Sequence, residues 1–274
     1  MNNSSLAQKS YEEALKYIQI TGSPDEVQTL QEVLQMIVST SAGRQIVQGL
    51  AARGETIPLF FVEDLKEKDA EFDFKLNGTF SSRDNSVKLL KEPTTLSEKS
   101  IHSRIKMARL LAHELQHSAD DEKNKWLSSY AANIDESVLV DVLAEAHAIL
   151  QEDQLKRELF FQYDLFDKKD TGEKGGPESV DPLPADRCKK AMERALSGSV
   201  PLFKKYMNRI RKIKAQKKYE VRNFRETMAF RNNVEYYLKK MLNSDMSFDE
   251  AMLWVKQSIK LLPAVKTKLT DRDK

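Results

Sequence analysis

The sequence is poor in the residues that make disulfides, tight turns and chain breaks. Its 274 residues include a single cysteine, Cys188, with only nine glycines and eight prolines. One cysteine cannot form an intrachain disulfide, which excludes a small disulfide-stapled extracellular scaffold. The charged neighbours of Cys188 favour a bystander thiol over a nucleophile. Few glycines and prolines favour long regular elements, mainly helices, over an all-β architecture with many turns.

Long apolar runs are also missing. No stretch reaches the roughly 18 to 20 apolar residues that a membrane span needs. The chain opens on MNNSSLAQKSYEEALKY, which has neither the basic nor the apolar segment of a Sec signal peptide. We therefore expect a cytoplasmic protein, or one secreted into a host cell by a specialised secretion system, because the polar start resembles the leaders of such secreted proteins.

The sequence has no zinc-finger, phosphate-loop or RNA-binding aromatic signature, so there is no clear nucleic-acid motif. A net charge of only +2 nevertheless conceals a basic block, because residues 187–222 contain thirteen Lys or Arg and two Glu. Apolar residues recur at helical spacing within it, from Leu202 to Ile213. We favour a core-facing helix with a solvated basic side. The alternative is a basic amphipathic helix that contacts an anionic membrane surface, nucleic acid or an acidic partner.

What is present fits a packed and largely helical protein, with 40 % hydrophobic and 31 % charged residues. Ser23, Pro24 and Glu26 together predict the start of a helix that runs to about residue 39. A second helix is expected over 42–53, ending at Gly54. Further helices are expected at 101–120, 135–161, 186–197, 200–215, 217–243 and 248–261, with a loop containing Trp126 after the first of these.

Between the early helices and residue 101 the pattern changes to that of strands. Residues 57–62 are apolar and aromatic, whereas 72–76 and 86–90 alternate with period two. Together with 79–81 they predict a small antiparallel sheet. The fold class is therefore α+β: a mostly helical domain over 1–167, a Gly- and Pro-containing linker over 168–185, and a basic helical region over 186–274.

The chemistry of the chain is concentrated in His113-Glu114-Leu115-Gln116-His117. Two histidines four residues apart lie on one face of a helix, a spacing that suits two ligands of a tetrahedral zinc. Glu114 lies about 100° further round the helix, from where it can act on a metal-bound water as general base without being a ligand. The other interpretation is that His113 and His117 simply face the solvent. His102 is eleven residues before His113, too far along the same helix to share a metal with it.

A zinc peptidase needs a third protein ligand, and the 135–161 helix is where we expect it. Its apolar stripe includes Val138, Val142 and Ile149, and Glu145 falls among them. A carboxylate on a buried stripe needs a partner, so we choose Glu145. His147, on nearly the opposite side, Asp141 and Glu136 remain alternatives. A His/His/Glu set also accepts manganese, iron or cobalt.

HELQH followed by an LAEAHA helix resembles the gluzincin-type zinc metallopeptidases, and more narrowly a group of bacterial metallopeptidase-like domains that includes suspected secreted effectors. The resemblance covers roughly residues 40–155. It implies a zincin-like domain in which His113, His117 and Glu145 hold Zn²⁺ and Glu114 is the base. It also implies that a strand near 78–90 pairs with an extended peptide substrate. Tyr130, Tyr163 and His147 are candidates for an oxyanion stabiliser.

The expected function is therefore hydrolysis of peptide bonds in a protein substrate by a zinc metalloprotease. The alternative is a non-enzymatic binding protein. In that interpretation the histidine pair is incidental and the basic C-terminal helices bind nucleic acid, an anionic membrane or an acidic partner.

Overall fold

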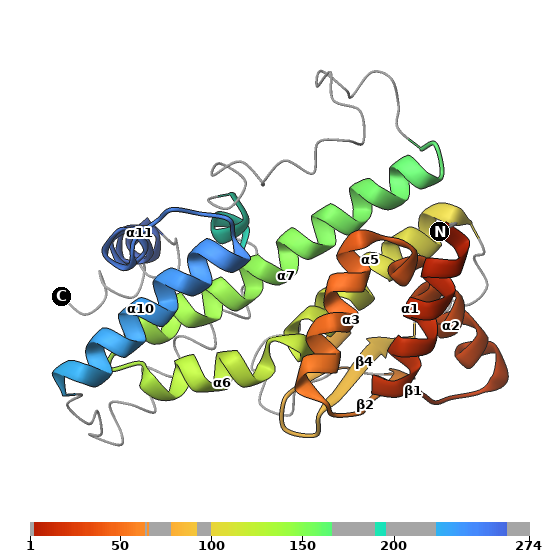
Figure 1. Cartoon of the computed structure of the whole chain (residues 1–274), viewed down its shortest axis with the longest axis horizontal. Helices are drawn as coiled ribbons and strands as arrows, with labels where there is room; N and C mark the ends of the chain where they lie inside the picture. The colour runs from red at the N-terminus through yellow and green to blue at the C-terminus, as the bar shows by residue number, and fades with distance from the viewer. Residues whose placement is uncertain are drawn as a thin grey trace, which may run out of the picture. The chain divides into compact units, whose positions relative to one another are not determined.

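The computed structural model describes residues 3–63, 65, 78–91, 100–165, 190–195 and 223–261. The helices are α1 (Asn3–Tyr17), α2 (Pro24–Ser39), α3 (Ser41–Arg53), α5 (Ile101–Ala119), α6 (Asp121–Tyr130), α7 (Ile134–Gln162), α10 (Phe224–Met241) and α11 (Phe248–Leu261). The strands are β1 (Ile18–Ile20), β2 (Ile57–Val62), β3 (Gly78–Ser81) and β4 (Ser86–Leu90). Helices dominate and one small sheet is present (Figure 1), which confirms the α+β class.

The chain divides into two compact units. Unit 1 comprises Met1–Asp121 and Gln151–Ser179, and unit 2 comprises Glu122–Leu150 and Val180–Lys274. The division falls inside α7, so this continuous helix contributes residues to both units. The expected linker at 168–185, the expected helix at 200–215 and Cys188 lie outside the described residues, so these remain predictions.

The sheet of unit 1 has the order β1-β2-β4-β3 and is mixed. β1 pairs with β2 and β2 with β4 in parallel, whereas β3 and β4 are antiparallel. The expectation of an antiparallel sheet was therefore wrong except for the last pair, and β1 was not foreseen. Parallel neighbours need a long crossover, which α2 and α3 provide between β1 and β2. The expected strand at 72–76 lies outside the described residues.

Local capping signals set the ends of α2 and α3 as expected. Ser23 forms a capping box with Glu26, whose carboxylate accepts from the Ser23 backbone N–H at 2.7 Å. α3 ends at Gly54, whose φ of +73° places it in the left-handed region that glycine occupies without strain.

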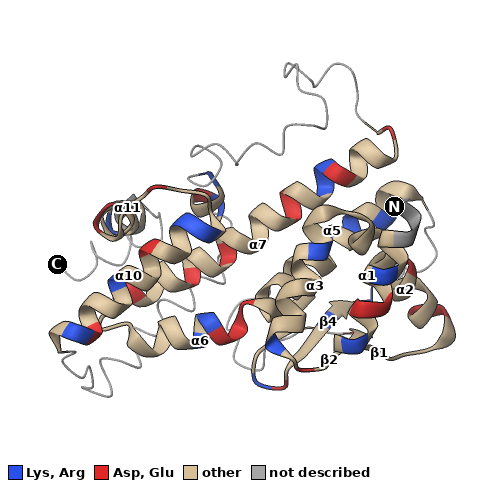
Figure 2. Ribbon diagram, viewed as in Figure 1, with Lys and Arg blue, Asp and Glu red and all other residues tan. Residues whose placement is uncertain are grey.

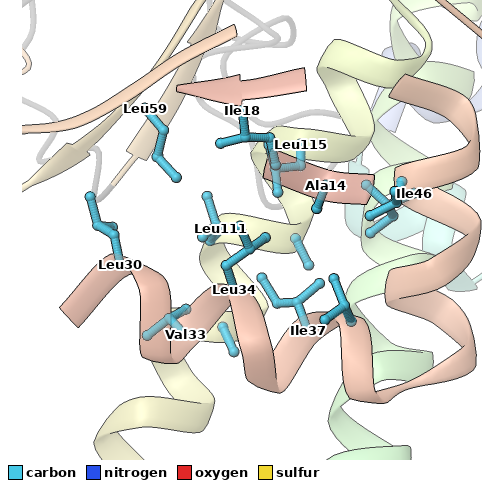
Figure 3. Close-up of a cluster of buried hydrophobic side chains, with 14 of the residues drawn as sticks. Ala14, Ile18, Leu30, Val33, Leu34, Ile37, Ile46, Leu59, Leu111 and Leu115 are labelled. Atoms are coloured by element: carbon cyan, nitrogen blue, oxygen red, sulfur yellow. The ribbon is translucent and has the colours of Figure 1, made fainter. Parts of the chain in front are cut away.

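One apolar core holds unit 1 together. Side chains from α1, α2, α3, α5 and the sheet point toward one another (Figure 3). Five large side chains of this core are fully buried, with relative accessibilities of 0 %: Leu30, Leu34, Ile37, Leu59 and Leu111. Burying such side chains is the main source of stability in a domain of this kind, at about 1.5–3 kcal/mol for each large one.

Unit 2 has its own apolar core, which is mainly helical among the described residues. It is formed by α6, the N-terminal part of α7, α10 and α11 together with residues 191–195, and its largest fully buried side chain is Phe230. The segment around Trp126 was expected to be a loop, but it forms the helix α6. This helix is stabilised because Leu127 is buried in the core of unit 2 and Trp126 packs on Tyr130 one turn later. This tertiary packing outweighs the weak helical pattern of the segment.

Capping boxes define the N-terminal ends of α10 and α11. α10 begins at Phe224, later than the expected 217, because Asn223 adopts an extended N-cap conformation and exchanges hydrogen bonds with Glu226. α11 begins at Phe248 as expected, with Ser247 and Glu250 bonded to each other. Acidic and basic residues intersperse along α7 and α10 (Figure 2). Among the described residues no helix combines the length and apolar character of a membrane span.

Candidate metal centre

The histidine pair lies in the C-terminal half of α5. This helix starts at Ser100, whose hydroxyl accepts from the Ser103 N–H at 3.2 Å, and it is unbroken to Ala119. His113 and His117 are one turn apart, and their Nε2 atoms lie 3.1 Å from each other. Two nitrogen ligands on a tetrahedral zinc would be about 3.3 Å apart, given Zn–N bonds of about 2.0–2.1 Å. The two rings therefore already have a spacing that fits a shared metal.

Glu145 joins this pair. One ligand atom of each of His113, His117 and Glu145 lies within 4.8 Å of the other two. Two imidazole nitrogens and one carboxylate oxygen form a donor set that suits zinc and leaves a fourth position for water or substrate. The three side chains are half-buried, which suits a site that a small ion and a substrate can reach.

The alternatives for the third ligand have other neighbours. His147 is 9 % exposed and its ring packs against Tyr237 of α10, with centroids 6.5 Å apart. The carboxylate of Glu136 accepts from the backbone N–H of Ala132 at 2.7 Å, at the start of α7. Asp141 remains an alternative for the third ligand.

Glu114 is buried, and the edge strand β3 fixes its carboxylate. Its Oε2 accepts a hydrogen bond from the backbone N–H of Phe80 at 2.7 Å. Phe80 therefore directs its N–H toward α5 and away from β4. Gly78 also lies close to Glu114, because a Cβ atom added to Gly78 would lie 3.3 Å from Cγ of Glu114. The expected general base is thus oriented by backbone atoms of a neighbouring strand.

Arg53 ties the β3–β4 hairpin to the end of α5. Its guanidinium donates to the Ser118 hydroxyl at 2.8 Å and to Oδ1 of Asn85, in the hairpin turn, at 2.6 Å. The same group lies 5.7 Å from the centroid of the Phe80 ring. Since the Arg53 side chain is only 3 % exposed, these contacts hold β3 firmly beside the helix that carries Glu114.

Glu152 is the residue of this region that sequence reasoning missed. Its Oε1 accepts from Nη2 of Arg109 at 2.6 Å, and its Oε2 lies 3.4 Å from Nδ1 of His113. Burial raises the pKa of the Glu152 carboxyl, but the His113 and Arg109 contacts outweigh burial and leave the pKa below its ordinary value. Helical spacing could have revealed Glu152, because it lies seven residues after Glu145 on the same helix.

The candidate oxyanion stabilisers lie in different surroundings. Tyr130 packs on Trp126, and His147 packs on Tyr237. Tyr163 lines a cavity of about 240 Å³ with Glu32 and Arg104. The structure gives no reason to choose one of them, so the oxyanion stabiliser stays unassigned.

Comparisons with family models, with curated proteins and with solved structures found no match to this chain.

Proposed function

We propose that this protein is a zinc-dependent metallopeptidase that hydrolyses peptide bonds of a protein or peptide substrate. The observation that carries the proposal is the convergence of His113, His117 and Glu145, from two helices, to within 4.8 Å. The first two come from one five-residue motif, and the third was chosen from the buried stripe of a later helix. Such a set in a helical His-Glu-x-x-His context is the ligand chemistry of hydrolytic zinc sites.

In this proposal His113, His117 and Glu145 hold the metal. Bound zinc would supply a Lewis acid and lower the pKa of a coordinated water toward about 7. Manganese, iron or cobalt could occupy the same donors, so the identity of the metal is part of what has to be measured.

Glu114 performs the proton transfers. Its carboxylate takes a proton from the attacking water and later gives it to the departing amine nitrogen. The Phe80 N–H at 2.7 Å supports this role, because it restricts the rotation of the carboxylate. A base that is already oriented loses less entropy when the transition state forms.

The substrate is proposed to be an extended peptide segment. Among the described residues β3 is an edge strand of the sheet, and it lies directly beside Glu114, which already accepts from the N–H of Phe80. An edge strand offers backbone N–H and C=O groups to an added strand, which is how many domains bind extended peptides. Location inside a host cell after secretion is part of this proposal, and the resemblance to domains that include suspected secreted effectors supports it.

The decisive experiment is to measure the metal content of the purified protein by elemental mass spectrometry. Wild type is compared with His113→Ala and Glu145→Ala, and with His102→Ala as a matched control on α5. His102 is exposed and belongs to the same helix as the proposed ligands. We expect about one zinc per chain in wild type and in the control, and loss of zinc in both ligand variants.

Two outcomes would change this assignment. Zinc retained in Glu145→Ala would move the third ligand to another acid or to His147. Absence of metal from the wild type after zinc is supplied would make the histidine pair incidental. The protein would then be tested first as a binding protein, by measuring its affinity for DNA, RNA and anionic vesicles at increasing salt concentration.

A further inference from the structure

Glu152 contacts two residues on the same side of α5. Arg109 and His113 are four residues apart, so their side chains leave the helix one turn from each other. Each carboxylate oxygen of Glu152 faces one of them, at 2.6 Å from Arg109 Nη2 and at 3.4 Å from His113 Nδ1. All three residues belong to unit 1. The Arg109 contact has the length of a strong charge-assisted hydrogen bond, so it fixes the carboxylate beside the histidine.

The Glu152 contact has a direct consequence for the His113 ring. An ionised carboxylate can only accept hydrogen bonds, so the nitrogen that faces it is stabilised in its protonated form. In a neutral imidazole a proton on Nδ1 leaves Nε2 with a lone pair. That Nε2 is the atom that lies 3.1 Å from Nε2 of His117. In the metal-free protein, Nε2 of His117 would then carry a proton and donate a hydrogen bond to Nε2 of His113.

We infer that Glu152, held by Arg109, is a positioning residue that keeps the proton of His113 on Nδ1 and so presents the Nε2 lone pair to a metal. This inference rests on the proposed function and names one of the residues that would make the metal site effective. Outer carboxylates of this kind fix the tautomer and the orientation of a ligand histidine.

One helix then supplies two parts of the site. Glu145 and Glu152 are seven residues apart on α7, so their directions around the helix differ by only about 20°. Glu145 is the proposed ligand. Glu152, two turns later, faces Nδ1 of His113, the ring nitrogen that would not bind the metal. A shift of α7 would therefore change the inner ligand and the outer carboxylate together.

The first measurement is the tautomer of His113 in the metal-free protein. Long-range proton–nitrogen NMR correlation at alkaline pH distinguishes the two neutral tautomers, and the spectrum of His113→Gln assigns the signal among the four histidines of the chain. We expect the Nδ1–H form at His113 in wild type. In Glu152→Gln we expect the Nε2–H form to gain population, because the amide no longer favours a proton on Nδ1.

The second measurement is zinc affinity, by competition with a chromogenic chelator. Glu152→Gln should weaken zinc binding by about 10- to 100-fold, the usual effect of removing an outer partner of a ligand. Asp153→Asn is the matched control, because it removes one charge at the next position of α7 and should leave both the tautomer and the affinity as in wild type. If Glu152→Gln fails to fold, Arg109→Gln tests the same contact from its other side.

The outcomes separate this inference from the proposed function. An Nε2–H tautomer at His113 in wild type overturns the inference even if zinc binds. An unchanged tautomer and an unchanged affinity in Glu152→Gln overturn it as well. If wild type binds no zinc, the proposed function fails, whereas the metal-free tautomer still decides whether Glu152 orients His113.

Discussion

The two sides of α5 differ in what they contribute to the protein. One side carries Ile105, Ala108, Leu111, Ala112 and Leu115, each at most 2 % exposed. These side chains pack in the core of unit 1 and need no partner beyond close contact. The other side carries Arg109, His113 and His117, whose polar atoms face one another or Glu152 at hydrogen-bonding or ion-pair distances.

The difference shows how a single helix can serve two purposes. Apolar burial stabilises the helix wherever its neighbours fill the space. Partly buried polar groups instead cost stability unless each one finds a partner, so their positions are restricted by geometry. We therefore expect mutations on the two sides to separate stability from chemistry, and the predictions below test this separation.

The largest effect is expected at the base. Glu114→Gln keeps the size of the side chain and its ability to accept from the Phe80 N–H, but an amide cannot take up the proton. Hydrolysis of an unfolded protein substrate should fall by about 10²- to 10⁴-fold. Zinc content and thermal stability should stay close to those of wild type.

The control for this variant is Glu122→Gln, an exposed acid on α6. It should hydrolyse the same substrate at the wild-type rate. Full hydrolytic activity in Glu114→Gln would refute the assignment of Glu114 as general base.

On the apolar side, Leu111→Ala should have the opposite profile. Leu111 is fully buried, so its truncation leaves a cavity and should lower the free energy of unfolding by about 2–5 kcal/mol. Chemical denaturation measures this loss. The activity per folded molecule should change little, provided that the comparison is made well below the melting temperature.

Leu15→Ala on α1 is the matched truncation, because Leu15 is 41 % exposed. Its effect on the free energy of unfolding should be much smaller. A Leu111→Ala protein with wild-type stability and greatly reduced zinc binding would show that the two sides of α5 are not separable.

Gly78→Ala, in the strand that contacts Glu114, is expected to have an intermediate effect on stability and on the rate of hydrolysis. The new methyl group would lie 3.0 Å from Leu89 Cδ2, 3.2 Å from Leu110 Cδ1 and 3.3 Å from Glu114 Cγ. Because these neighbours are side chains that can shift, the free energy of unfolding should fall by only about 1 kcal/mol. The rate of hydrolysis should fall more than this loss of stability explains. An unchanged rate would contradict our view that Gly78 helps to position the base.

The smallest effect concerns a residue far from α5. Hydrogen bonding to the Ser23 backbone, followed by the contact with Lys91, lowers the pKa of Glu26 below its ordinary value of 4.5. A lowered pKa in the folded state stabilises the protein above the unfolded pKa, and this contribution is lost as the pH falls through the folded pKa. The stability difference between wild type and Glu26→Gln should therefore shrink below about pH 4.5, whereas zinc binding at neutral pH should not differ.

Sequence reasoning succeeded where the signal is local. Ser23 with Glu26, and Gly54, are within four residues of the helix ends that they set, and the structure has those ends. The histidine pair is equally local, because a helix of any context places residues four apart on one face. Glu145 was chosen in the same way, from its place on the apolar stripe of its own helix, and its role as a ligand remains a prediction.

Sequence reasoning failed where the signal depends on distant partners. The parallel pairing of β2 with both β1 and β4 joins segments separated by helices or by another strand, and no local pattern specifies that order. α6 was taken for a loop because its helix depends on the burial of Leu127 and on the stacking of Trp126 with Tyr130. The packing of His147 on Tyr237 was not foreseen for the same reason, because Tyr237 is ninety residues later in the chain.

The sequence by itself determined the spacing of the two histidines on α5 and led to the choice of Glu145 as the proposed third ligand, because both follow from the period of the helix. The tertiary structure decided which further groups act on them. Phe80 reaches Glu114 and Glu152 reaches His113 only because β3 and α7 lie beside α5. Those contacts join residues more than thirty positions apart, so they depend on how the elements pack and not on the composition of any one of them.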